Sequence, residues 1–188
     1  MKRYICIQKC PELDCDNSKH CTNTEEGIQT KEEIRDYCPC GNTAMWVDLE
    51  IKGVETFHDK VSGSKRGKNT VYNFKIDGIN ICHCGDLGHI LNSKQIEEIG
   101  SVDILLLPIG GLATINAFDA TEVMKQLTPT IVIPMHYRTK ALGLLGYVFG
   151  TVDKFISVSG LKAKEYDKLE LNRTNMKDYS GIVVLKYN

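Results

Sequence analysis

Apolar and polar positions from residue 47 onward switch between the spacing of strands and that of helices. Residues 70–84 read TVYNFKIDGINICHC, two strand-like runs around an Asp-Gly pair, which predicts a β-hairpin. Residues 116–128 carry apolar side chains at helical spacing, which predicts an amphipathic helix. Further strands are predicted at 47–58 (one bent strand or a pair), 102–110, 130–136 and 181–187, and further helices at 93–100 and 152–160.

This order of elements predicts an α/β fold, in which helices cover a mixed sheet. The run VDILLLPIG at 102–110 lacks polar alternation, which is typical of a strand covered on both faces. The helix at 93–100 is expected to begin with Ser93 as its N-cap and to end at Gly100. Residues 137–151 are expected to form a glycine-rich loop.

Residues 1–47 form a compositional unit of their own, so we predict a small Cys-rich segment at 1–47 and a domain at 48–188. Six of the eight cysteines lie within the first 40 residues, and without a secretion signal such a cluster favours metal binding. Redox-active thiols and a disordered segment are the alternatives. The candidate ligands of a structural zinc in a knuckle-like module are Cys6, Cys10, Cys38 and Cys40, with Cys15, His20 and Cys21 as alternates.

Composition excludes several classes of function. The 188 residues carry a formal net charge of −1, which gives no electrostatic basis for binding nucleic acid. No apolar run approaches the roughly 20 residues of a membrane-spanning helix. The N-terminal residues MKRYICIQKCPELDC lack the apolar core of a signal peptide, so the expected compartment is the cytoplasm.

Three candidate metal ligands follow predicted strands. Asp86 comes after the strand that ends in NICHC, His136 after TIVIPM, and His58 lies upstream in VETFHD. Imidazole and carboxylate groups both suit zinc, and strand ends hold side chains in fixed positions. The pattern therefore indicates a hydrolytic metal centre.

Four motifs occur in the order FHDKVSGSKRGKNT, GDLGH, DILLLPIGG and IPMHYRT. Together they resemble the metallo-β-lactamase superfamily, in its branch of small metal-dependent hydrolases akin to L-ascorbate-6-phosphate lactonase. The resemblance covers about residue 50 to the C-terminus. It implies that Asp86 bridges two metal ions, zinc or else manganese or iron, and that His136 and His58 each bind one. It also implies a catalytic role for Asp86, with metal-activated water attacking an ester, lactone or phosphoester.

The motif HxHxDH, which supplies most of the remaining ligands in that superfamily, does not occur in this sequence. The chain therefore resembles the C-terminal half of the αββα sandwich, with the missing ligands expected from a homo-oligomer or a complementing subunit. We expect weak or absent hydrolysis by the chain alone. The alternative hypothesis is a non-catalytic zinc-binding or interaction protein, built from the Cys-rich module and a degenerate hydrolase half.

The substrate is expected to be a small molecule, with an anionic group. The loop SGSKRGKN supplies Arg66 and Lys68 as candidate anion-binding residues, and Tyr137 follows the last histidine. His89 is a candidate catalytic or ligand-orienting residue. Along the strand before GDLGH, strict alternation places Cys82, Cys84 and Asp86 on one face and His83 on the other, with both cysteines in the core.

Overall fold

The computed structural model describes residues 3–6 and 46–186. The chain divides into two compact units, residues 1–50 and 51–188. In the first unit, β1 (Arg3–Cys6) pairs antiparallel with the start of β2 (Trp46–Phe57). Of the four cysteines proposed for a structural zinc, Cys6 closes β1, and Cys10, Cys38 and Cys40 lie outside the described residues.

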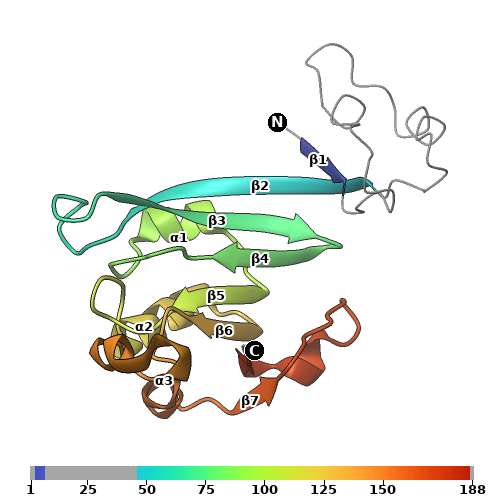
Figure 1. The fold of residues 1–188 in the computed structure, drawn as a ribbon. Coiled ribbons are helices and arrows are strands. Elements are labelled where there is room, and N and C mark those ends of the chain that lie inside the picture. The colour runs from blue at the N-terminus through green and yellow to red at the C-terminus, as the bar shows by residue number, and fades with distance from the viewer. Residues whose placement is uncertain (1–2, 7–45, 187–188) are drawn as a thin grey trace, which may run out of the picture. The chain divides into compact units, whose positions relative to one another are not determined.

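The second unit is a mixed sheet with helices, which confirms the predicted α/β class (Figure 1). Its strand order is β2-β3-β4-β5-β6-β8-β7. The strands after β2 are β3 (Lys68–Ile76), β4 (Ile79–His83), β5 (Ile104–Pro108), β6 (Ile131–Met135), β7 (Ala163–Tyr166) and β8 (Gly181–Leu185). β3 and β4 are antiparallel, whereas the pairs from β4 to β7 are parallel.

The predicted hairpin is confirmed, since Asp77 and Gly78 connect β3 to β4 with φ values of 48° and 79°. The helices are α1 (Ser93–Ile99), α2 (Ala117–Leu127) and α3 (Val152–Ser159). The expected cap of α1 was wrong by one residue, because the Asn92 side chain accepts the capping hydrogen bond from the Gln95 amide, and the Asn92 amide donates to the Gln95 side chain.

Two further features differ from the sequence expectation. The strand β7 was not predicted, because AKEY is short and mostly polar. Residues Lys140–Val148, expected as loop, form 3₁₀ turns (η2) with a break at Gly143, and a second 3₁₀ turn (η3) covers Met176–Tyr179. No helix among the described residues is both long enough and apolar enough to cross a membrane.

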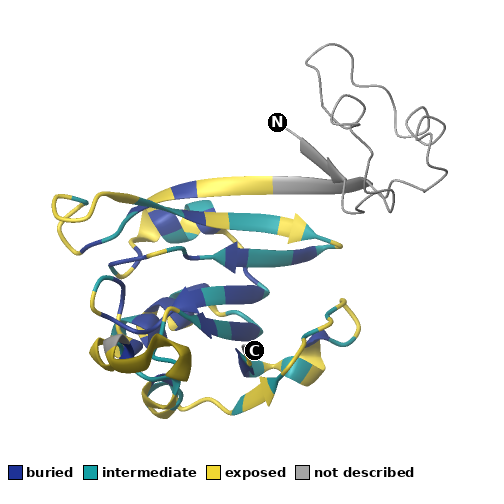
Figure 2. Cartoon of the chain, viewed as in Figure 1, coloured by how far each residue is buried: buried dark blue, intermediate teal, exposed yellow. Residues whose placement is uncertain are grey.

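Alternation along the strands sends side chains to two faces of the sheet, and the two faces are covered differently. One face carries Leu105, Leu107 and Val132 and packs against all three α-helices in the main core. The other carries Ile104, Ile131 and Val183, which pack against residues 166–179. Burial is deepest in the central strands and falls toward β2 and β7 (Figure 2). The site described next lies on the face away from the α-helices.

Candidate functional site

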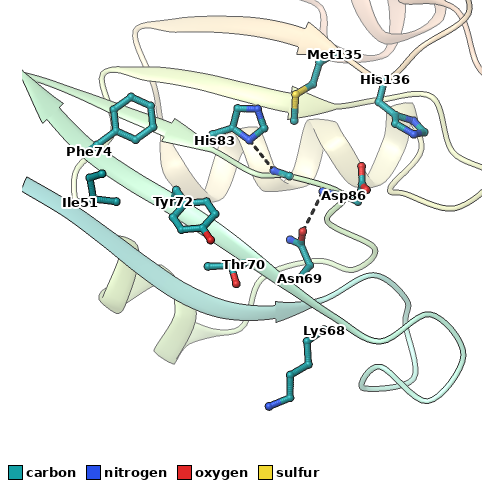
Figure 3. A pocket seen from close by; sticks show the side chains of 11 residues that line it. Ile51, Lys68, Asn69, Thr70, Tyr72, Phe74, His83, Asp86, Met135 and His136 are labelled. Atoms are coloured by element: carbon teal, nitrogen blue, oxygen red, sulfur yellow. Dashed lines mark hydrogen bonds between the residues drawn. The ribbon is translucent and has the colours of Figure 1, made fainter. Parts of the chain in front are cut away.

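A pocket of about 850 Å³ is lined by residues of β3 and by residues at the ends of β4 and β6 (Figure 3). Asp86 and His136 lie at one end of this pocket, and Ile51 and Phe74 lie at the other (Figure 3). The structure thus brings together two of the three residues that the sequence indicated as metal ligands. The lining residues are Ile51, Lys68, Asn69, Thr70, Tyr72, Phe74, His83, Gly85, Asp86, Met135 and His136.

Asp86 is held by a turn that Asn69 organises. The Asp86 amide donates to Asn69 Oδ1 at 3.0 Å, and Asn69 Nδ2 donates to the Cys84 carbonyl at 2.9 Å. Gly85 adopts φ 57°, and a Cβ there would lie 2.6 Å from Asn69 Oδ1, so this position requires glycine. The Asp86 side chain is exposed to the pocket.

This turn overturns one sequence expectation. Cys82 and Cys84 are fully buried, as predicted, but Asp86 does not share their face. The alternation of β4 ends at His83, and the left-handed Gly85 redirects the chain, so Asp86 and His83 line the same pocket. His83 is therefore a site residue that strict strand alternation missed. The hydrogen bond with Cys82 and burial both raise the pKa of Cys84, which keeps this thiol in its neutral form.

His136 follows β6 in a left-handed conformation, with φ 52°. Such a conformation is uncommon for a residue with a Cβ, and it clusters at functional sites. The imidazole makes an edge contact with Phe149, with ring centroids 5.3 Å apart. The Ile109 amide donates to the Met135 carbonyl at 3.1 Å, which joins the end of β5 to the residue just before His136.

His58 lies beside the GDLGH segment but does not line the pocket. The Gly88 amide donates to the Phe57 carbonyl at 2.9 Å, so two of the motifs quoted above are in contact. His58 Nε2 is buried and has no hydrogen-bond partner among the described residues. Within the described part of the chain, no group of three or more His, Cys, Asp or Glu side chains could hold a metal ion. A catalytic zinc takes three protein ligands, so these residues alone do not fit a complete metal site.

His89 uses both ring nitrogens on the backbone. Nε2 accepts a hydrogen bond from the Phe57 amide at 3.1 Å, and Nδ1 lies 2.8 Å from the Ile90 carbonyl. The first contact requires a lone pair on Nε2, which leaves the proton on Nδ1 to donate to the carbonyl. The ring therefore joins residues 57 and 90, and it does not line the pocket.

The three candidate substrate-binding residues are dispersed. Lys68 lines the pocket, and its ammonium group lies 2.9 Å from Glu55 Oε2. The Arg66 side chain is exposed outside the pocket lining, while its amide donates to Asp59 Oδ2 at 2.8 Å. Tyr137 is half-buried and packs against the main core. Of these three, only Lys68 contributes to the pocket wall.

Asp59 organises the glycine-rich loop between β2 and β3. Its carboxylate accepts hydrogen bonds from the amides of Val61, Gly63, Lys65 and Arg66 at 2.8–3.0 Å. Burial raises the pKa of Asp59, but the four backbone donors act in the opposite direction and together lower it from 3.8 to about 2. Four backbone amides of the loop that supplies the candidate anion-binding residues therefore already bind a carboxylate of this chain, that of Asp59.

Asp59→Asn is expected to destabilise the protein at neutral pH and to matter less in acid. A carboxyl whose pKa is lowered on folding contributes stability above its unfolded pKa, and loses it as pH falls from about 4 to about 2. Urea unfolding should show that the difference in free energy of unfolding between wild type and variant is largest at pH 7 and decreases below pH 4. The exposed Asp153→Asn is the control. If that difference in free energy stays constant down to pH 2, the lowered pKa of Asp59 is contradicted.

Comparison with known proteins gives a consistent family assignment. Residues 16–136 match the model of the beta-lactamase superfamily domain, a match that begins inside the Cys-rich segment. A metal-dependent hydrolase from Pelotomaculum thermopropionicum is 33% identical over 123 residues, covering 57% of this chain and 54% of that protein. A metal-dependent hydrolase from Thermoplasma volcanium is 40% identical over 103 residues, covering 53% of this chain and 44% of that protein.

Among solved structures, a proposed Zn-dependent hydrolase of the metallo-beta-lactamase superfamily from Thermotoga maritima is similar with a TM-score of 0.62 and 39% sequence identity. The similarity covers 74% of this chain and 66% of that one. The chain spans about half the length of the curated relatives it matches.

Proposed function

Because the chain belongs to the beta-lactamase superfamily, we propose that it supplies part of the active site of a metal-dependent hydrolase. The observation that carries the proposal is that Asp86 and His136, from two different strand ends, line one pocket. A carboxylate and an imidazole are both ligands for zinc, the metal that we propose. Two relatives that are 33% and 35% identical over part of this chain are metal-dependent hydrolases by name, which supports the reaction class.

The remaining ligands are proposed to come from outside the described residues, either from a second subunit or from a complementing polypeptide. Two donors do not hold zinc as firmly as the three protein ligands of ordinary catalytic sites. The site lies on the sheet face that the α-helices leave uncovered, so a partner could reach it. The chain by itself is then a weak or inactive hydrolase. For the substrate we propose a small ester, lactone or phosphoester.

Each side chain at the metal end of the pocket is given a defined position by its neighbours. The turn around Asn69 holds the Asp86 carboxylate toward the pocket, and the left-handed backbone of His136 directs its imidazole away from the line of β6. A carboxylate and an imidazole held in this way lose little conformational freedom on binding an ion. We therefore assign to this chain the role of presenting two ligands.

Cobalt substitution tests this proposal through ligand chemistry. Co²⁺ bound by oxygen and nitrogen ligands absorbs differently from Co²⁺ bound by thiolates, so the pocket and the N-terminal cysteines can be separated. We expect wild type to show a weak absorption of Co²⁺ bound by oxygen and nitrogen ligands. Asp86→Ala and His136→Ala should each abolish this absorption and leave any absorption of thiolate-bound Co²⁺ unchanged. Glu97→Ala, an exposed change on α1, is the control.

Activity of the same variants is a second readout. Hydrolysis of ester and lactone probes by the chain alone should be weak or absent, so Asp86→Ala should change it little. A cobalt spectrum with thiolate bands alone, identical in wild type and both variants, would instead favour a non-catalytic zinc-binding protein and would refute the proposed function.

A further inference from the structure

His83 lines the pocket but belongs neither to the predicted metal ligands nor to the end of the pocket that carries Asp86 and His136. It closes β4, where it pairs with Tyr72 on one side and Leu106 on the other. Strand alternation from Ile79 and Ile81 sends its side chain to the face away from the α-helices. Its imidazole lies between the metal end of the pocket and the apolar end (Figure 3).

The protonation of the His83 ring follows from one hydrogen bond. The Gly85 amide donates to His83 Nδ1 at 3.0 Å (dashed in Figure 3). A backbone amide can only donate, so Nδ1 must present its lone pair, and the neutral ring carries its proton on Nε2. Among the described residues, none is a hydrogen-bond partner of Nε2. The ring therefore presents an N–H group at the pocket, where solvent or a ligand can accept its hydrogen bond.

An N–H group at this position excludes one role and favours another. An imidazole binds a metal ion through an unprotonated nitrogen, so His83 is not a ligand through Nε2 in the tautomer that the Gly85 hydrogen bond selects. An N–H group instead requires an acceptor oxygen, and carboxylate and phosphate oxygens give the strongest such hydrogen bonds. Lys68 also lines the pocket, but its ammonium group is paired with Glu55 and points away from His83 in Figure 3.

We propose that His83 is a substrate-binding residue, whose Nε2–H donates a hydrogen bond to a carboxylate or phosphate oxygen of the substrate. This assignment rests on the proposed function in placing the substrate in the pocket of Asp86 and His136. The apolar side chains of Phe74 and Met135 line the same pocket, so a substrate anchored at His83 would have apolar contacts within reach. The turn that orients Asp86 also orients His83, through the amide of Gly85.

The tautomer can be measured without any substrate or metal. Long-range ¹H–¹⁵N correlation spectra of the full chain with ¹⁵N-labelled histidine report which ring nitrogen carries the proton. The spectrum of His83→Gln identifies the His83 signals by their disappearance. We expect an unprotonated Nδ1 and a protonated Nε2 for His83. A His83 ring protonated on Nδ1 alone would overturn the proposal.

Anion binding tests the role itself, with inorganic phosphate and acetate as separate probes. We expect at least one to bind wild type saturably, and His83→Phe, which lacks the N–H group, to bind it about tenfold more weakly. His83→Gln, whose side-chain amide can donate, should recover part of the affinity. The probe that binds more tightly, phosphate or acetate, indicates whether the anionic group of the substrate is a phosphate or a carboxylate. Equal affinities in wild type and His83→Phe, or no saturable binding to wild type, would overturn the proposal.

Cobalt spectra of the same variants separate this proposal from the proposed function. If His83 binds substrate, His83→Phe leaves the oxygen and nitrogen signal of cobalt unchanged while it weakens anion binding. If that signal disappears in His83→Phe, His83 is a metal ligand and the proposal fails. Loss of anion affinity in His83→Phe, with no cobalt signal in wild type, would support the anion site and refute the metal site.

Discussion

Gly110→Ala is expected to destabilise the protein by about 3 kcal/mol and to displace His136 from the pocket. Gly110 follows β5 and is buried against the turn after β6. A Cβ at this position would lie 2.1 Å from the His136 carbonyl oxygen and 3.1 Å from Tyr137 Cα. These are backbone atoms, so no side-chain rotation relieves the contact and the two strand ends must separate.

The hydrogen bonds around Gly110 allow little room for such a movement. Its carbonyl accepts from the Gly150 amide at 2.7 Å, and the Gly150 carbonyl accepts from the Arg138 amide at 2.9 Å. This closed connection joins the turn that carries His136 to the segment before α3. Urea unfolding measures the loss of stability, and the cobalt signal described above reports the position of His136.

Gly160→Ala is the matched control for Gly110→Ala. Gly160 ends α3 in a left-handed conformation, with φ 69° and ψ 7°, and nothing lies within 4 Å of its missing Cβ, so alanine there costs only backbone strain, about 1 kcal/mol. If Gly110→Ala lowers the free energy of unfolding no more than Gly160→Ala does, the close approach of the two strand ends is not a tight constraint in solution.

Most of the second unit could be predicted from the sequence because its signals are local. The Asp-Gly turn defined the hairpin, and the apolar stripe of Ala117, Ala120, Val123, Met124 and Leu127 defined α2, where all five side chains are buried. The signals failed where structure depends on tertiary contacts. The polar strand β7 forms because β8 lies beside it, and Asn92 caps α1 one residue before the position that Ser93 suggested.

The candidate site was predictable only in part, for a physical reason. Asp86 and His136 follow apolar strands that end at the same edge of the sheet, which the sequence pattern indicates. His83 lines the same pocket because the left-handed Gly85 interrupts the alternation after β4. A turn of this kind has no repeating sequence pattern, so it could not be predicted. His58 remains a predicted ligand, in contact with the GDLGH segment through its neighbour Phe57 but outside the pocket lining.

Asn69 is the residue that connects these site elements, and no sequence motif indicated its role. Its Nδ2 donates to Thr56 Oγ1 at 2.8 Å and to the Cys84 carbonyl at 2.9 Å, and its Oδ1 accepts from the Asp86 amide at 3.0 Å. Thr56 is fully buried, so its hydroxyl has few alternative partners. One amide side chain therefore fixes the turn that orients both Asp86 and His83.

Asn69→Ala is expected to destabilise the protein by about 2–3 kcal/mol, since it leaves buried groups without their partners. It should also loosen the Asp86 turn, which weakens the oxygen and nitrogen signal of cobalt and broadens the His83 ring resonances. Asn73→Ala is the matched control, because Asn73 also lies on β3 and donates to the Ile99 and Ser101 carbonyls at 2.6 and 3.2 Å, away from the pocket. Asn73→Ala should lower stability but leave cobalt binding and the His83 tautomer unchanged. Equal losses of cobalt binding in the two variants would mean that Asn69 acts on the pocket only through overall stability.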